Sequence, residues 1–187
     1  MSKKFYWEDF PVGSVTEYGG VTLTKEDIIR FAKEFDPQPF HIDEEAAKHS
    51  QFGGLVASGW HTCSLCMRMM CDAYLLDSAN LASPGVENIR WLKPVRPGDT
   101  LHVRSVVLEA RPLESKPHIG LMRNRWEVLN QNGEEVMQME GYGMMHRRSH
   151  RKMKSHALRL HRHPREGGYP GSFGKSLDSR LRGNDGV

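Results

Sequence analysis

The sequence contains one long stretch with few charges, SGWHTCSLCMRMMCDAYLL (residues 58–76). Its residues are apolar almost all round a helix, which predicts a helix over residues 60–76 that is buried on most sides. Arg68 and Asp72 interrupt the stretch, so its composition argues against a membrane-spanning segment. We expect this helix to be the centre of the fold.

The segments around this helix predict mostly strands. Before it, we expect a strand over residues 14–23, a helix capped by Thr24 that ends at residue 35 or 36, a loop to residue 41 and a helical turn over residues 43–48. After it come strand-like runs over residues 86–92, 100–110, 119–130 and 134–145, with turn sequences at 97–99 and 132–133. The order predicts an α+β fold, with an antiparallel sheet wrapped around one long helix.

Charge divides the chain into two unlike parts. Residues 1–146 carry 15 Lys and Arg against 20 Asp and Glu, whereas residues 147–187 carry 11 against 3. We therefore expect one folded domain over residues 1–146 and a disordered basic tail over residues 147–187. The tail resembles the translated product of an intergenic repeat element common in bacterial genomes, which implies that the domain does not need it.

Several classes of protein do not fit the composition. The first residues contain no apolar segment of a secretory signal, and the three cysteines, Cys63, Cys66 and Cys71, are too few and too close together for a disulfide framework. We expect a cytoplasmic protein in which these thiols are buried, with no partner nucleic acid and no membrane partner. The acidic charge of the first 146 residues also argues against a nucleic-acid-binding body.

The segment FDPQPFHID (residues 35–43) carries the candidate chemistry. Two prolines stiffen a short connection between Asp36 and His41, which would hold a carboxylate and an imidazole in a fixed relation, as a general acid and base that share one water require. The alternative is that Asp36 caps a backbone group and that His41 completes a turn.

A second candidate feature is Gly59 at the start of the long helix. The first amides of a helix are free donors at the positive end of the helix dipole, and a glycine lets a ligand approach them closely, so this site could bind an oxyanion. The alternative is that Ser58 caps the helix and Gly59 only relieves crowding. His61 could line a pocket, although a structural role is the simpler interpretation.

Taken together, these segments resemble the MaoC-like acyl dehydratases, or (R)-specific enoyl-CoA hydratases, of the hotdog superfamily. The resemblance covers about residues 5–145 and rests on the Asp-x4-His motif at Asp36 and His41, the following Asp43, and the turn PVRPGD at residues 94–99. It implies a hotdog fold with the long helix enclosed by the sheet. Gln38 replaces the usual Asn, Ser58 replaces a common His, and Met67 stands near the position of a serine in some relatives.

The resemblance also implies a function, a hydro-lyase that adds water to a trans-2-enoyl-CoA or dehydrates a 3-hydroxyacyl-CoA. Asp36 and His41 would be catalytic, and the Gly59 N–H would form the oxyanion hole. Substrate binding would involve Ser58, Trp60, Pro39 and Phe40, with Trp60 narrowing the acyl pocket.

The same resemblance implies no metal and no other cofactor, because the thioester itself accepts the electrons. It further implies an acyl-CoA substrate and a homodimer or higher homo-oligomer. A hotdog acyl-CoA thioesterase and a noncatalytic acyl-binding module are the alternatives. Arg90 and Lys93 could contact CoA phosphates or could simply be solvated, and Arg68 and Asp72 could pair at a subunit boundary.

Overall fold

The computed structural model describes residues 3–148. Its elements follow in the order η1 (Trp7–Asp9), β1 (Val15–Thr22), α1 (Lys25–Phe35), α2 (Pro39–Ile42), α3 (Glu44–Lys48), α4 (Gly59–Met70), η2 (Cys71–Leu75), β2 (Asn80–Ala82), β3 (Val86–Trp91), β4 (Thr100–Pro112), β5 (Ile119–Leu129) and β6 (Glu135–His146). The predicted elements are present. The structure adds three that were not predicted, the 3-10 turn η1, the short helix α2 and the short strand β2.

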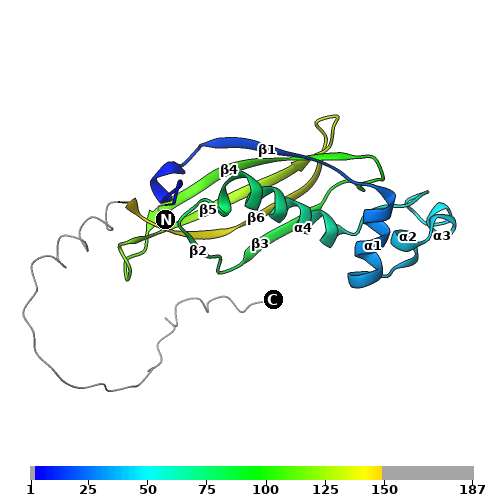
Figure 1. Ribbon diagram of the computed structural model, residues 1–187, viewed down its shortest axis with the longest axis horizontal. Coiled ribbons are helices and arrows are strands. Elements are labelled where there is room, and N and C mark those ends of the chain that lie inside the picture. The colour runs from blue at the N-terminus through cyan, green and yellow to red at the C-terminus, as the bar shows by residue number, and fades with distance from the viewer. Residues whose placement is uncertain (1–2, 149–187) are drawn as a thin grey trace, which may run out of the picture.

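All the strands belong to one antiparallel sheet. The strand order is β1-β4-β5-β6, and both β2 and β3 pair with the other edge of β6. β2 pairs with Met144 and Met145 of β6, and β3 pairs with residues 137–141. Figure 1 shows α4 lying across one face of the curved sheet, while α1, α2 and α3 gather at one end of it. The β5–β6 turn holds Gly133 at a φ of 74°, a conformation that glycine adopts without steric cost. The predicted antiparallel sheet around a central helix is therefore confirmed.

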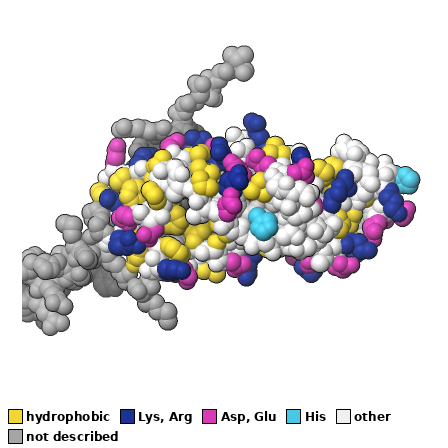
Figure 2. Space-filling model, turned by 90° about the horizontal axis from the view of Figure 1, so that it is seen from above, with side chains coloured by type: hydrophobic (Ala, Val, Ile, Leu, Met, Phe, Trp, Pro, Cys, Tyr) yellow, Lys and Arg dark blue, Asp and Glu magenta, His cyan; other side chains and the backbone are white. Residues whose placement is uncertain are grey.

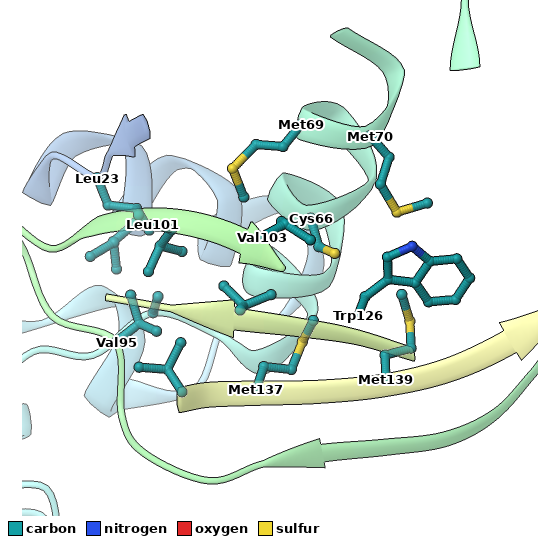
Figure 3. Packing of buried hydrophobic residues seen from close by; sticks show 14 of the residues in the cluster. Leu23, Cys66, Met69, Met70, Val95, Leu101, Val103, Trp126, Met137 and Met139 are labelled. Carbon is teal, nitrogen blue, oxygen red and sulfur yellow. The ribbon is translucent and has the colours of Figure 1, made fainter. Parts of the chain in front are cut away.

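The core lies between α4 and the sheet and is rich in sulfur. In Figure 3, Cys66 and Met70 point from α4 toward the side of the core that holds Trp126 and Met137 of β5 and β6, whereas Met69 points to the other side of the helix. Each of these five residues is at most 6% exposed. This packing fixes the helix against the sheet and fills the space between them along most of its length.

The prediction that residues 60–76 are buried on most sides is wrong. Trp60 is 56% exposed, Met67 47% and Leu76 66%, and the buried residues of α4 occupy one face of the helix. The helix also changes at Cys71, where a π-helical turn, η2, replaces the α-helix. Apolar composition all round a helix does not distinguish a core helix from one with an apolar outer face.

The segment before α4 forms the end of the molecule that carries the candidate site. Thr24 caps α1 by accepting a hydrogen bond from the Asp27 N–H, as predicted, and α1 ends at Phe35 because Pro37 follows. The prediction of a loop that runs to residue 41 is wrong, because the short helix α2 begins at Pro39. Proline is favoured at the first position of a helix, where no N–H is needed.

Two residues assigned to the tail by composition, Arg147 and Arg148, contact the domain. Arg148 forms an ion pair with Asp9 at 2.6 Å, and Arg147 donates a hydrogen bond to the Pro117 carbonyl at 2.9 Å and lies over the Trp7 ring. The first two residues of the predicted disordered tail therefore contact the domain. The rest of that prediction, over residues 149–187, lies outside the described residues.

On the face in Figure 2, acidic and basic side chains of the described residues are interspersed.

Candidate active site

Asp36 occupies the C-cap of α1, where Pro37 turns the chain away from the helix. Its carboxylate accepts two side-chain hydrogen bonds, from Ser58 Oγ to Oδ2 at 2.6 Å and from Gln38 Nε2 to Oδ1 at 2.8 Å. The interpretation of Asp36 as a cap for a backbone group is wrong, because both of these donors are side chains. The carboxylate is held in place from two sides.

The environment of Asp36 acts on its pKa in opposite directions. Partial burial raises the pKa, whereas the hydrogen bonds from Ser58 and Gln38 and the nearby His41 lower it, and the net effect is a pKa below the ordinary value. Hydrogen bonds to a carboxylate favour its charged form. Asp36 is therefore ionised at neutral pH and can accept a proton.

His41 lies on α2 and is 6% exposed. Its Nδ1 is 2.8 Å from the Val56 carbonyl oxygen, which can only accept a hydrogen bond, so Nδ1 carries the proton. In the neutral imidazole, Nε2 is then an acceptor, and it faces Asp36 Oδ2 at 3.5 Å. The structure thus brings Asp36 and His41 together, and the edge of the His41 ring packs against Phe40.

The loop between the two residues explains why they meet. The Gln38 N–H donates to the Asp36 carbonyl at 2.8 Å, and the His41 N–H donates to the Gln38 carbonyl at 2.9 Å, so successive tight turns connect α1 to α2. Pro37 and Pro39 restrict the backbone on both sides of Gln38. Asp43, the next acidic residue, instead caps α3 through hydrogen bonds from the Glu45 and Ala46 N–H groups.

Ser58 connects the carboxylate to the start of α4. It is fully buried, and its Oγ donates to Asp36 while it accepts a hydrogen bond from the Trp60 N–H at 3.2 Å. The next residue, Gly59, is the first of the helix, so its N–H has no acceptor four residues earlier within the helix. A side chain at Gly59 would overlap the indole of Trp91 unless that indole moved, which favours glycine at this position.

A cavity of about 470 Å³ opens beside these groups. Its polar wall residues are Asp36, Gln38, His41, Gly59, Thr62 and Lys93. The remaining wall is aromatic and aliphatic, from Phe40, Phe52, Val56, Ala57, Trp60, Trp91, Leu92, Pro94, Val95 and Val136. A largely apolar cavity with a few convergent polar groups is typical of a site for a small organic ligand.

The predicted substrate-binding residues separate into two groups. Phe40 and Trp60 lie in the cavity wall, whereas Ser58 and Pro39 do not. Ser58 acts on the site through Asp36, and Pro39 starts α2. Direct contact of Ser58 with substrate is therefore not supported by its position, and its place is that of a positioning residue.

The structure also adds residues that were not predicted. Trp91, at the end of β3, packs over Gly59 and edge-on against Trp60, with ring centroids 5.5 Å apart. Val56 contributes the carbonyl that fixes the His41 tautomer. The sequence carries no local signal for either residue. Trp91 contacts residues about 30 positions earlier in the chain, and Val56 contributes only a backbone carbonyl.

Other candidate residues lie outside this site. His61 is buried and stacks on Phe31 with ring centroids 4.5 Å apart, away from the cavity wall, and burial lowers its pKa. Arg68 and Asp72 form an exposed ion pair at 2.9 Å. Lys93 pairs with Glu134 at 2.6 Å, and nothing in the structure assigns Arg90 or Lys93 to a phosphate.

The three cysteines are free thiols. Cys66 is buried as predicted, and burial raises the pKa of its thiol to about 12. Cys63 and Cys71 are half-buried, so the prediction that all three thiols are buried is wrong. In the described part of the chain, no helix has the length and apolar character needed to cross a bilayer.

Comparisons with known proteins agree on one family. The model of the MaoC-like domain family matches residues 11–125. The uncharacterised protein YdeM of Bacillus subtilis is 31% identical over 134 residues, which are 72% of this chain and 92% of that protein. The 3-hydroxybutyryl-CoA dehydratase of Methylorubrum extorquens is 30% identical over 112 residues, 57% of this chain and 66% of that protein.

Solved structures agree with the observed fold. The MaoC-like dehydratase of Rhodospirillum rubrum is 41% identical, with a TM-score of 0.73 over 77% of this chain and 98% of that one. A double-hotdog protein of Mycobacterium tuberculosis, 19% identical, gives a TM-score of 0.64 over 76% of this chain and 44% of that one, which supports the fold alone. The fold is therefore a hotdog fold, and the chain belongs to the MaoC-like domain family of hydratases and dehydratases.

Proposed function

We propose that the protein is a hydro-lyase that adds water across the 2,3-double bond of a short enoyl-CoA and, in the reverse direction, dehydrates the 3-hydroxyacyl-CoA. The observation that carries the proposal is that the Asp36 carboxylate and the His41 imidazole face each other, Oδ2 to Nε2 at 3.5 Å, in the wall of an apolar cavity. The family of the chain, which includes such enzymes, supports the same reaction class.

When His41 is neutral, its Nε2 and the Asp36 carboxylate are both acceptors and need a donor shared between them. A carboxylate and an imidazole Nε2 lone pair cannot hydrogen-bond to one another, but one water can donate a hydrogen to each. Because the Val56 carbonyl fixes the His41 tautomer, this arrangement orients the oxygen of that water. The pair is therefore suited to hold and deprotonate a water.

The proposed chemistry balances with these groups alone. Asp36 takes one proton from the water, and the water oxygen forms a bond to C3 of the enoyl group. The electron pair of the C2–C3 double bond moves toward the thioester carbonyl, which becomes an enolate. The Asp36 carboxyl then returns its proton to C2, a transfer that its lowered pKa favours. His41 holds the water throughout.

The Gly59 N–H is the proposed donor to the enolate oxygen. It lies at the first position of α4, where the helix dipole favours negative charge, and it belongs to the same cavity wall as Asp36 and His41. One such donor contributes about 2.7–4 kcal/mol to transition-state stabilisation in well-studied enzymes. Trp91 packs over Gly59 and so helps to position this amide.

The cavity wall supports a short or branched acyl chain. Trp60 and Trp91 stand edge to face in the wall, and the buried side chains of Cys66 and Met137 belong to the core between α4 and the sheet. We therefore expect turnover of a C4 enoyl-CoA and little turnover of a C12 one. Equal rates for the two would contradict this part of the proposal.

The test of the function uses purified protein and crotonyl-CoA, with the enoyl absorbance and free thiol followed together. A hydro-lyase removes the absorbance without releasing thiol, and Asp36→Asn and His41→Ala abolish that loss. Thiol release would indicate a thioesterase instead. Binding of acyl-CoA by calorimetry without either signal, over a range of chain lengths, would indicate a noncatalytic acyl-binding module.

We also propose that the working form is a homodimer. The supporting observation is an apolar outer surface on the edge strand β3 and the adjoining face of α4, where Val86 is 52%, Trp91 48%, Trp60 56% and Met67 47% exposed. Strands with a free edge and an apolar neighbour favour pairing with another chain. Met67→Glu should convert a dimer to a monomer in analytical ultracentrifugation, and a wild-type monomer at micromolar concentration would refute the proposal.

A further inference from the structure

Thr62 is a polar wall residue of the cavity with no part in the proposed acid–base chemistry. Asp36, Gln38 and His41 are engaged with one another or with their neighbours, the Gly59 N–H is assigned to the thioester oxygen, and the Lys93 ammonium pairs with Glu134. Thr62 remains. It lines the cavity and is only 2% exposed.

The hydroxyl of Thr62 is free of the usual helical partner. A threonine within a helix commonly donates to the carbonyl four residues earlier. Ser64 on the same helix does so, with its Oγ 2.9 Å from the Trp60 carbonyl. No corresponding bond, and no other side-chain hydrogen bond within the described part of the chain, engages Thr62, whose backbone N–H alone bonds to the Ser58 carbonyl.

The position of Thr62 along α4 places it next to the reacting groups. It follows Gly59 by three residues, so both residues lie on neighbouring turns of the same helix face. Val136 of β6 also contributes to the cavity wall, and the closed core begins with Cys66, one turn further along α4. An acyl group whose carbonyl oxygen is bound at Gly59 would extend its far end toward Thr62 and Val136 in the cavity wall.

A hydroxyl in the cavity wall that has no protein partner is available to a ligand that supplies one. Sites that hydrogen-bond a substrate hydroxyl discriminate strongly against the analogue without it, whereas purely apolar pockets tolerate an added hydroxyl. The hydroxyl of Thr62 therefore distinguishes this cavity from one shaped only for alkyl chains.

We propose that Thr62 is a specificity-determining residue that selects short enoyl thioesters carrying a hydroxyl or carbonyl oxygen near the end of the acyl chain. This inference rests on the proposed function and extends it to a class of substrate. Thr62 contacts the far end of the acyl group and takes no part in the transfer of protons. The substrate of this class is a neutral, polar C4 or C5 enoyl-CoA.

The test compares crotonyl-CoA with 4-hydroxycrotonyl-CoA, which differ by one hydroxyl. We expect wild-type kcat/KM to favour the hydroxylated substrate by at least about tenfold. Thr62→Val, which keeps the side-chain shape, should abolish the preference through a higher KM for the polar substrate, and Thr62→Ser should retain it. Ser64→Ala, which removes the hydroxyl that bonds to the helix backbone, is the matched control and should behave as wild type.

The outcomes separate this inference from the function on which it rests. Turnover of both substrates with equal kcat/KM, or a ratio unchanged by Thr62→Val, overturns the role of Thr62 and leaves the hydro-lyase intact. Absence of hydration with either substrate, by a wild-type protein whose folding is verified by circular dichroism, overturns the proposed function itself and the inference with it.

Discussion

Removal of the Ser58 hydroxyl should weaken the catalytic carboxylate and the fold together. Ser58→Ala deletes the 2.6 Å hydrogen bond to Asp36 and the cap of α4 at a fully buried position. A hydrogen bond to a charged group contributes about 1.5–3 kcal/mol. One pKa unit corresponds to about 1.36 kcal/mol, so the pKa of Asp36 should rise by about one unit or more.

The assay is the pH dependence of kcat/KM for crotonyl-CoA hydration, whose acid limb reports the pKa of the base in the free enzyme. The limb should move to higher pH in Ser58→Ala. Ser64→Ala, the matched control, should leave it in place. An unchanged acid limb in a folded Ser58→Ala protein would refute the reasoning that Ser58 holds the charged form of Asp36.

The same substitution should also change how the free energy of unfolding depends on pH. The pKa of Asp36 is lowered by folding, so the stabilisation linked to its charge is present above the ordinary carboxyl value of 3.8 and is lost as the pH falls through the lower pKa of the folded protein. The difference in unfolding free energy between wild type and Ser58→Ala in urea should therefore be largest near neutral pH and become smaller in strong acid. A difference that grows in acid would contradict this assignment.

Three further predictions concern residues outside the acid–base pair. Because burial lowers the pKa of His61 below 6.5, the unfolded chain binds more protons just below that pH, and the urea midpoint should fall as the pH drops through it. His61→Phe should flatten that dependence, and an equally steep decline would exclude His61. Gly59→Ala should lower the free energy of unfolding by about 1–3 kcal/mol, because the added methyl group meets the Trp91 indole. In a double-mutant cycle, the same substitution should cost less in the Trp91→Ala background. Equal costs in the two backgrounds would argue against the clash. Deletion of residues 149–187 should leave the Tm unchanged, whereas deletion of 147–187 should lower it through the lost contacts with η1, and identical Tm values would contradict this.

The sequence was most informative where chemistry and geometry are local. The Asp36–His41 pair was predictable because prolines restrict a short connection, and the structure places these two side chains together. The hairpin at residues 132–133 and the cap at Thr24 were predictable for the same reason. Each of these features depends on residues within a few positions of one another.

Features that depend on distant contacts were not predictable from the sequence. The role of Ser58 depends on its hydrogen bond to Asp36, 22 residues earlier, and that of Trp91 on its packing over Gly59. The exposed outer face of α4 could not be distinguished from a buried one, because its apolar residues look alike in either setting. The two arginines after β6 were assigned to the tail by composition, whereas their contacts are with η1.

The central claim is that Asp36 and His41 activate a water that attacks C3 of the acyl chain and not the thioester carbonyl. Mass spectrometry of crotonyl-CoA incubated with the protein in ¹⁸O-labelled water tests it directly, because it locates the new oxygen. We predict one labelled oxygen in 3-hydroxybutyryl-CoA, with CoA still attached, and no labelled product with Asp36→Asn. Labelled oxygen in released crotonic acid, with free CoA, would contradict the account.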